Sequence, residues 1–125
     1  MNTHLDHKGV EARKKGLQIV LDRIAAMNPE SYPMVLTGDF NVTPDDSCLD
    51  ELDTKMQSAR NIASSTDNYT TYNSWGKKSL EDSFIIDYIY VKGFSSVPFY
   101  RTVTAPYDGV QYLSDHYPIM SILCF

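Results

Sequence analysis

Four short polar clusters interrupt the apolar runs of this sequence, and each carries an Asp, a His or an Asn beside an expected strand. They are Asn2-Thr3-His4, Gly38-Asp39-Phe40-Asn41, Ile86-Asp87-Tyr88 and Ser114-Asp115-His116-Tyr117-Pro118. An unpaired charge buried beside a strand costs several kcal/mol, so these groups need partners or water. We therefore expect the clusters to share one polar site, whose carboxylates and imidazoles suit acid–base or metal-assisted chemistry.

Each cluster taken singly also has a purely structural explanation. A Gly-Asp pair after a strand is usually a turn, and Asp115-His116 alone is compatible with a surface loop. Asp87 differs, because both faces of its expected strand are mainly apolar and a lone carboxylate there needs a partner. His116 is the candidate partner, so the combination favours a catalytic site.

The elements that must position these residues follow from the hydrophobic pattern. Apolar residues at helical spacing predict a helix over Val10 to Met27, which Asn28-Pro29 ends. A short buried strand is expected from Pro33 to Gly38, and it leads directly into Asp39. Polar residues at the end of a buried strand mark the place where folds that mix helices and strands build their sites.

The rest of the chain reads as one more helix and several strands. Thr43 as N-cap, followed by Pro44, predicts a helix that runs to about Lys55. The segment from Ser58 to Asp82 is expected to be a surface excursion with one short strand at Tyr69 to Tyr72. Segments rich in β-branched and aromatic residues predict three further strands, over Phe84 to Val91, Phe99 to Thr104 and Tyr117 to Phe125.

Length and composition limit the classes of protein to consider. The 125 residues fit a single domain, 1–125, and 42% hydrophobic residues suffice for a core. The net charge of -5 argues against sequence-independent nucleic-acid binding, although a metal ion can supply local positive charge to a nuclease. No apolar run reaches the ~20 residues that span a bilayer, and no signal peptide is recognisable, so we expect a cytoplasmic protein as given.

The order and spacing of the motifs resemble those of the endonuclease/exonuclease/phosphatase superfamily. Asn2 to His7 resembles its central histidine motif, and Thr71 to Gly76 is similar to a loop that precedes its Ile-Asp-Tyr strand. The resemblance implies an α+β fold, part of a two-sheet β-sandwich with flanking helices (deoxyribonuclease I-like), with the N-terminal half absent. This C-terminal half is expected to supply about one sheet, with helices on its outer face and its inner face open.

The resemblance also implies a catalytic role for five residues. His116 would contact the scissile phosphate or act as the acid–base group, and Asp87 would bond its other ring nitrogen and fix the tautomer. Asp39 would orient the attacking water, while Asn41 and His4 would donate hydrogen bonds to phosphate oxygens. Such roles neutralise the charge that develops when a phosphate ester is cleaved.

The implied cofactor is a divalent cation, Mg²⁺ or Mn²⁺. Asp115 and Asp39 are the metal ligands expected on this chain, consistent with the preference of both ions for hard oxygen donors. The glutamate that is a principal ligand in the family belongs to the half that the sequence does not contain. His7 is expected to be a first-turn or loop residue and not a ligand.

Two classes of function follow. The first is a divalent-metal-dependent hydrolase of phosphate esters, most similar to a phosphodiesterase or nuclease when complete, with phosphomonoesters or phospholipid head groups as the alternative substrates. The second is a catalytically incomplete half-domain that serves as an interaction or dimerisation fragment. The expected partners are the phosphate ester, with nucleic acid as one form of it, and a second copy bound as a homodimer through the open sheet face.

Overall fold

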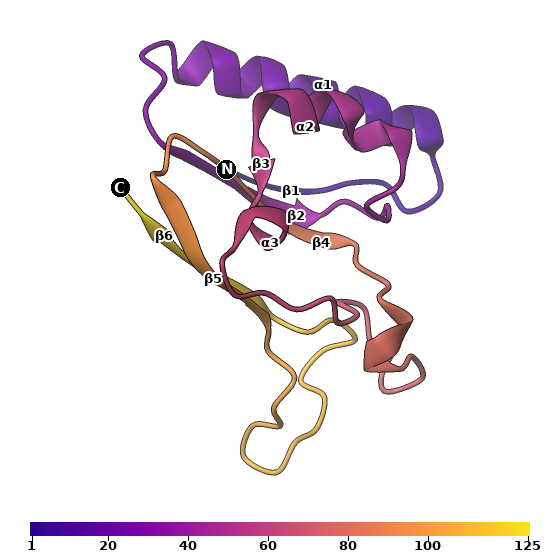
Figure 1. Ribbon diagram of the computed structural model, residues 1–125. Helices are drawn as coiled ribbons and strands as arrows, with labels where there is room; N and C mark the ends of the chain where they lie inside the picture. Colours follow the sequence, from indigo (N-terminus) through magenta and orange to yellow (C-terminus); the bar gives the residue numbers. More distant parts are fainter.

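Six strands form two sheets, and the helices α1 and α2 lie on one side of the larger sheet (Figure 1). The computed structural model describes residues 1–125. The elements, with two short 3₁₀ helices, are β1 (Asn2–His4), α1 (Val10–Met27), β2 (Met34–Asp39), a 3₁₀ turn (Ser47–Leu49), α2 (Asp50–Lys55), β3 (Gln57–Ser58), α3 (Ala59–Ile62), a 3₁₀ turn (Leu80–Asp82), β4 (Asp87–Lys92), β5 (Ser96–Thr102) and β6 (Ile119–Cys124).

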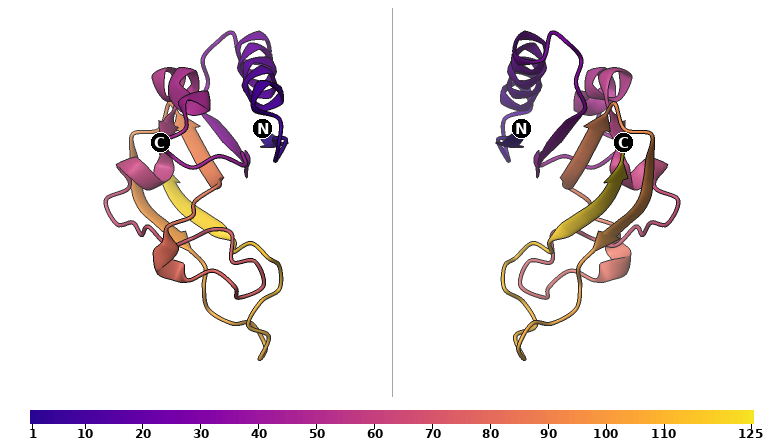
Figure 2. Two further views of the ribbon diagram at one scale, coloured as in Figure 1. Left: turned by 90° about the vertical axis from the view of Figure 1, so that its right-hand side faces the viewer. Right: turned by 90° about the vertical axis from the view of Figure 1, so that its left-hand side faces the viewer.

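The larger sheet has the strand order β1-β2-β4-β3, and the smaller one pairs β5 with β6. β1 runs parallel to β2 and is joined to it by α1, whereas every other pair is antiparallel. Side views show α1 and α2 on one face of the four-stranded sheet and β5 and β6 on the other (Figure 2). The chain therefore builds three layers, of helices, a sheet and a partial second sheet.

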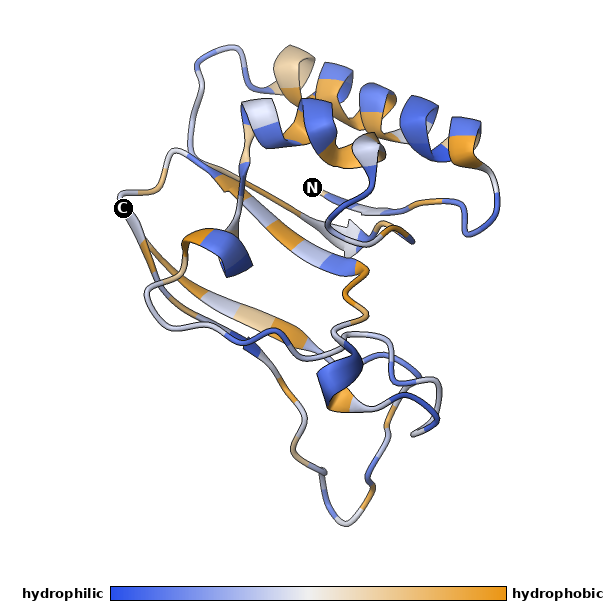
Figure 3. Cartoon of the chain, turned by 45° about the vertical axis from the view of Figure 1, so that its right-hand side comes forward, coloured by the Kyte–Doolittle hydropathy of each residue, from blue (hydrophilic) through white to orange (hydrophobic).

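Alternation along the central strands separates two cores. Leu36 of β2 and Tyr88 and Tyr90 of β4 point toward the helices, where Leu17 and Leu21 of α1 complete the larger cluster. The hydropathy view shows the apolar sides of α1 and α2 turned toward the sheet (Figure 3). Residues of the opposite pleat, Val35, Ile89 and Val91, pack against Val97 and Tyr100 of β5. Asp87 has the parity of Ile89 and Val91, so its carboxylate belongs to the face that looks toward the second sheet.

The helix predicted over Val10 to Met27 is confirmed as α1, but the second helix begins later than predicted. The hydroxyl of Thr43 donates to the carboxylate of Asp45, so it is not the N-cap. Asp46 caps the 3₁₀ turn instead, accepting from the amide of Cys48 at 2.8 Å. The predicted end at Lys55 is correct.

Several predicted strands differ from the observed ones. The segment predicted over Phe84 to Val91 enters the sheet only at Asp87, because the amides of Phe84 and Ile86 bond threonine hydroxyls. Tyr69 to Tyr72 forms no strand, and it contributes only an isolated bridge between Tyr72 and His116. β5 begins at Ser96 and β6 at Ile119, close to the predicted positions.

The expectation of one sheet with an open inner face is wrong in part. β5 and β6 form a second sheet that covers the inner face of the first over Val91 and Val35. The larger sheet is left uncovered toward β1 and the ends of β2 and β4, which border a cavity described below. The broader expectation, a mixed α+β fold forming part of a two-sheet sandwich with flanking helices, is confirmed. None of the helices combines the length and apolar character that a membrane-spanning helix requires.

Candidate functional site

Three of the predicted site residues are direct neighbours across three strands. Asp39, the last residue of β2, is the register partner of Asp87, the first residue of β4. His4, the last residue of β1, is the register partner of Asp39 on the other side. Register partners share a face of the sheet, so one row across the sheet holds an imidazole and two carboxylates.

His116 lies over this row and is held by one of its carboxylates. Its Nδ1 is 2.8 Å from Asp87 Oδ2, and its Nε2 is 3.8 Å from Asp39 Oδ2. The ring of Tyr72 packs at a tilt against the imidazole, with 5.0 Å between ring centroids. A carboxylate on Nδ1 favours the tautomer with its proton there. Nε2, the atom facing Asp39, is then left to exchange a proton or contact a ligand.

Asp39 has one oxygen engaged and one facing the imidazoles. Its Oδ1 accepts from the amide of Asn41 at 2.8 Å, whereas Oδ2 lies 3.3 Å from His4 Nε2. Burial raises the pKa of this carboxyl, and the neighbouring Asp87 raises it further. The Asn41 amide and the two histidines only partly offset that effect. Asp39 is therefore a desolvated carboxylate that a cation or a proton would stabilise.

His4 and Asn41 border the site with different degrees of constraint. The side chain of His4 is 73% exposed, and its one recorded contact is with Asp39. Asn41 has a positive φ of 53°, which asparagine tolerates better than most residues, and its Nδ2 donates to the carbonyl of Leu5 at 2.8 Å. One N–H of that amide group remains for a ligand. The structure thus gives Asn41 a second role, because it ties the β2 end to the segment after β1.

Two residues not among the predicted site residues hold the groups of the candidate site in place. The hydroxyl of Thr71, which is fully buried, accepts from the amides of Ile86 and Asp87 at 3.0 and 3.1 Å. Its carbonyl accepts from the amide of Tyr117 at 2.7 Å. Asn73, also buried, ties its segment to the backbone just before His116. Its main-chain amide donates to the Asp115 carbonyl, and its Nδ2 donates to the Ser114 carbonyl. The resemblance of Thr71 to Gly76 to a family loop was the signal for this support.

One group of donor atoms could hold a metal ion. Ligand atoms of Asp39, Asp87 and His116 all lie within 4.8 Å of one another. Asp87 Oδ2 is engaged by His116 at 2.8 Å, whereas the nearest imidazole nitrogen to Asp39 Oδ2 is that of His4, at 3.3 Å. Asp115 is not part of the group, and its carboxylate contacts only the hydroxyl of Ser114, at 3.4 Å.

A cavity of about 510 Å³ opens beside the row of site residues. It is bordered by Asn2, Thr3, His4, Thr37, Gly38, Asp39, Asp87, Tyr88, Ile89, Tyr117, Pro118 and Ile119. The carboxylates and His4 thus line an open space large enough for a small ligand. Outside it, His7 is exposed, and the ammonium of Lys78 lies over the Phe84 ring, 4.3 Å from its centroid.

Comparison with solved structures gives the same fold repeatedly. A conserved protein of unknown function from Enterococcus faecalis V583 is 31% identical, with a TM-score of 0.84, over 98% of this chain and 48% of its own. The mannosyl-6-phosphatase Bt3783 of Bacteroides thetaiotaomicron is 28% identical, with a TM-score of 0.88, over 99% and 50% of the two chains. An endonuclease/exonuclease/phosphatase protein from Bacteroides vulgatus is 30% identical, with a TM-score of 0.83, over 96% and 46%.

These matches define a phosphoesterase fold, and the order of the motifs is that of the same fold. The chain belongs to the endonuclease/exonuclease/phosphatase superfamily and corresponds to the C-terminal half of its domain. It spans about half the length of the solved structures it matches. Neither a scan against protein-family models nor a search of curated proteins gives a match.

Proposed function

We propose that this chain carries the acid–base half of a phosphate-ester hydrolase site, and that the complete enzyme is a metal-dependent phosphodiesterase. The observation that supports the proposal is the line from Asp87 through the His116 imidazole to Asp39, with separations of 2.8 and 3.8 Å. A carboxylate on one ring nitrogen, with the other nitrogen beside a second carboxylate but beyond hydrogen-bond distance of it, suits general acid–base catalysis.

The contacts of each residue suggest its role in the reaction. Asp87 holds one proton of His116 on Nδ1, and in the doubly protonated imidazolium the second proton, on Nε2, can bond a phosphate oxygen or pass to the leaving alkoxide, which leaves a neutral imidazole. Asp39, a carboxylate whose pKa is raised by burial, orients the attacking water. His4 and the free N–H of Asn41 donate to the other phosphate oxygens, which neutralises charge in the transition state.

The donor set fits a divalent cation through its carboxylates. The desolvated Oδ2 of Asp39 is the proposed direct ligand, and Asp115 the second ligand, directly or through water, for Mg²⁺ or Mn²⁺. When bound, such an ion would neutralise charge on the phosphate and stabilise the leaving oxygen. The geometry favours Asp39 over Asp115, since Asp115 lies outside the group of close donor atoms.

Two alternatives rest on separate observations. The mannosyl-6-phosphatase neighbour, at 28% identity, supports a phosphomonoesterase acting on a sugar phosphate. Only Asp39, Asp87 and His116 bring metal-ligating atoms together, and every match above is covered over about half of its length; both observations support an incomplete half-domain. The first alternative predicts turnover of monoesters over diesters, and the second predicts phosphate binding without turnover.

We also propose that a second copy packs on the exposed apolar side of β6. Met120 and Ile122 are 45% and 50% exposed on the side of the strand away from the core, and Phe125 beyond it is 88% exposed. Side chains of this size gain ~1.5–3 kcal/mol each when they are removed from water. Sedimentation equilibrium at micromolar concentration should give a dimer mass, and a monomer mass at that concentration contradicts the proposal.

The test of catalysis is hydrolysis of bis(p-nitrophenyl) phosphate and of p-nitrophenyl phosphate with Mg²⁺, with Mn²⁺ and with chelator. We expect metal-dependent turnover, faster for the diester, that His116→Ala removes and that the exposed control His7→Ala leaves intact. Equal rates in His116→Ala and the parent chain would contradict the role of His116. Absence of turnover, with phosphate still bound, would favour the incomplete half-domain.

A further inference from the structure

A second cavity meets the candidate site on the other side of His116. It has a volume of about 380 Å³ and lies under the loop that joins β5 to β6. His116, Tyr117 and Pro118 line it, and the last two also line the cavity that holds Asp39 and Asp87. Residues 116–118 therefore separate the polar cavity beside Asp39 and Asp87 from this second cavity.

The lining of the second cavity has no Lys, Arg, Asp or Glu. Its members are Asn73, Val103, Ala105, Pro106, Tyr107, Val110, Gln111, Tyr112, Leu113, Ser114, His116, Tyr117 and Pro118. A polyanion such as a nucleic-acid strand needs cationic side chains along its path, and none borders this space. The tyrosines instead offer ring faces, on which a planar ring or the apolar face of a sugar stacks.

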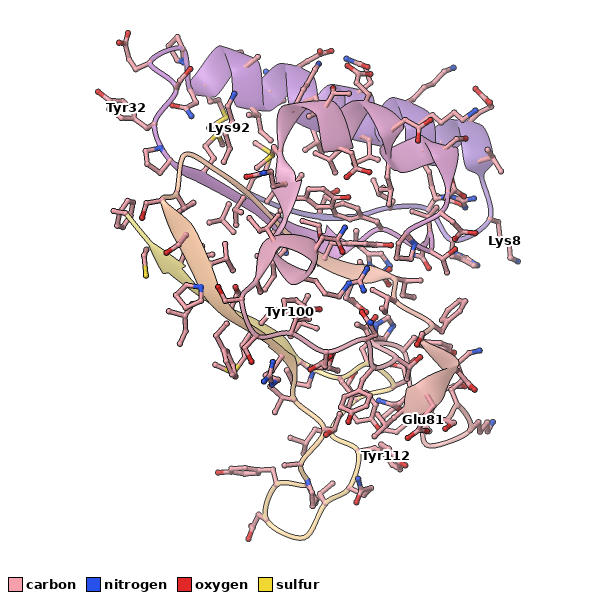
Figure 4. All side chains as sticks on the ribbon, viewed as in Figure 1. Lys8, Tyr32, Glu81, Lys92, Tyr100 and Tyr112 are labelled. Atoms are coloured by element: carbon pink, nitrogen blue, oxygen red, sulfur yellow. The ribbon has the colours of Figure 1, made fainter.

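The loop that forms this cavity has a defined shape. Tyr107 and Val110 exchange two backbone hydrogen bonds, of 3.0 and 2.9 Å, around Asp108 and Gly109. Both central residues have positive φ, 48° and 77°, as in a type I′ hairpin turn. Tyr112, on the returning side of the loop, packs closely against Gly76 (Figure 4 labels Tyr112). Its ring is so near that a Cβ atom added to Gly76 would lie 2.7 Å from it. Tyr107 and Leu113 remain 71% and 68% exposed beside the cavity.

We propose that this cavity binds the organic group of the phosphate ester, and that this group is a single uncharged ring. The inference rests on the proposed function, because it assumes that phosphate occupies the neighbouring polar cavity. The volume is sufficient for a ring and lies near the lower end of the ~300–1,000 Å³ range of ligand pockets, which favours a small organic group over a segment of a polymer. A substrate would thus lie across residues 116–118, with its phosphate at Asp39 and its ring at Tyr107 and Tyr112.

Binding to the ¹⁵N-labelled chain, followed by NMR, tests the proposal without requiring turnover. The ligands are inorganic phosphate, p-nitrophenyl phosphate, a hexose 6-phosphate and a five-residue oligothymidylate, each added in the presence of Mg²⁺ because two carboxylates and no cationic side chain line the phosphate cavity. We expect one or both ring-bearing monoesters to bind about 10-fold more tightly than inorganic phosphate and to shift the amides of Tyr107 and Leu113. Whichever of the two binds more tightly identifies the ring as an aryl group or a sugar.

Matched variants separate the cavity from the phosphate site. Tyr107→Ser should remove the tighter binding of the ring-bearing esters and leave the affinity for inorganic phosphate unchanged. Leu113→Ser should reduce the affinity for the ring-bearing esters in the same way. The control is Tyr32→Ser, a tyrosine that is 67% exposed and lies at the far end of the molecule from Tyr112 (Figure 4).

Three outcomes overturn the proposal. If inorganic phosphate binds as tightly as the ring-bearing esters, the cavity has no such role, while the proposed function stands. Tightest binding of the oligothymidylate contradicts a single-ring substrate. If no phosphate compound binds, and His116→Ala turns over the nitrophenyl substrates at the same rate as the parent chain, both the proposed function and this inference are wrong.

Discussion

The row of strand ends that carries Asp39 and Asp87 and the loop from Val103 to Leu113 border the same histidine, but they are built in opposite ways. Asp39 is fixed by sheet pairing on both sides, and Asp87 by pairing to β2 and by the buried hydroxyl of Thr71. The loop is held by one hairpin turn and by the packing of Tyr112 against Gly76 and Tyr117, and it leaves large apolar side chains in water. Groups that must meet within a hydrogen bond are placed on the sheet, whereas a surface that only has to accommodate a ligand is placed on a loop.

The largest expected difference between the two regions is in catalysis. Asp87→Asn keeps the shape of the side chain but loses the charge that orients His116, and we expect turnover of the complete enzyme to fall by about 10³-fold. Asp108→Asn, the same change at the tip of the loop, should leave the rate within about 2-fold. Steady-state kinetics with the diester substrate measures both, and a smaller loss for Asp87→Asn than for Asp108→Asn would contradict the comparison.

The next largest difference is expected in the stability lost when a glycine in each region is replaced by alanine. Gly38 has a φ of 154°, and a Cβ there would lie 1.8 Å from the carbonyl oxygen of Thr3, so Gly38→Ala cannot keep β1 paired to β2. We expect a loss of at least about 3 kcal/mol in the free energy of unfolding. Gly109→Ala, with nothing within 4 Å of the added carbon, should cost only about 1 kcal/mol for its positive φ. Urea denaturation followed by circular dichroism measures both, and equal losses would show that β1 does not depend on Gly38.

The buried hydroxyl of Thr71 offers a sharper test within the site. Thr71→Val leaves the amides of Ile86 and Asp87 without an acceptor, and we expect it to destabilise the chain by about 2 kcal/mol. Thr71→Ser retains the hydroxyl and should recover most of that loss. Thermal unfolding of the three proteins gives the order, and a serine variant as unstable as the valine variant would mean that packing of the methyl group, not the hydrogen bonds, matters.

The smallest expected effect is a gain in stability, from the replacement of Asp39. Because burial raises the pKa of Asp39, the folded state binds its proton more tightly than the unfolded state, whose pKa is near 3.8. The free energy of unfolding therefore falls as pH rises from about 3.8 through the raised pKa, and the full penalty is present at pH 7. Asp39→Asn should raise the melting temperature at pH 7, with the gain absent below pH 3.8. A variant less stable than the parent at pH 7 would show that attraction from the histidines outweighs burial.

Much of this arrangement could be predicted from the sequence where a pattern acts locally. Leu17 and Leu21 follow helical spacing and Pro29 stops the helix, so the bounds of α1 were predicted correctly. The grouping of Asp39, Asp87 and His116 followed from the cost of burying charge alone.

The remaining errors come from long-range hydrogen bonds that no local pattern encodes. Phe84 and Ile86 look like strand residues, but their amides bond the hydroxyls of Thr70 and Thr71, 14 and 15 residues away. For the same reason the buried roles of Thr71 and Asn73 were not predicted, although their loop was identified by resemblance. The direct register of His4, Asp39 and Asp87 likewise depends on how three distant strands align.

The chain has one tryptophan, and its position makes it a selective optical probe. Trp75 is 59% exposed, and its amide donates to Asn73, the residue that ties this segment to the Ser114 carbonyl. Its emission is therefore expected to report the order of this loop beside the candidate site, whereas the packed rings of Phe40, Tyr88 and Tyr90 contribute to the near-ultraviolet dichroism of the core. Fluorescence and dichroism can thus follow the site and the core of this chain as two separate signals in a single denaturation experiment.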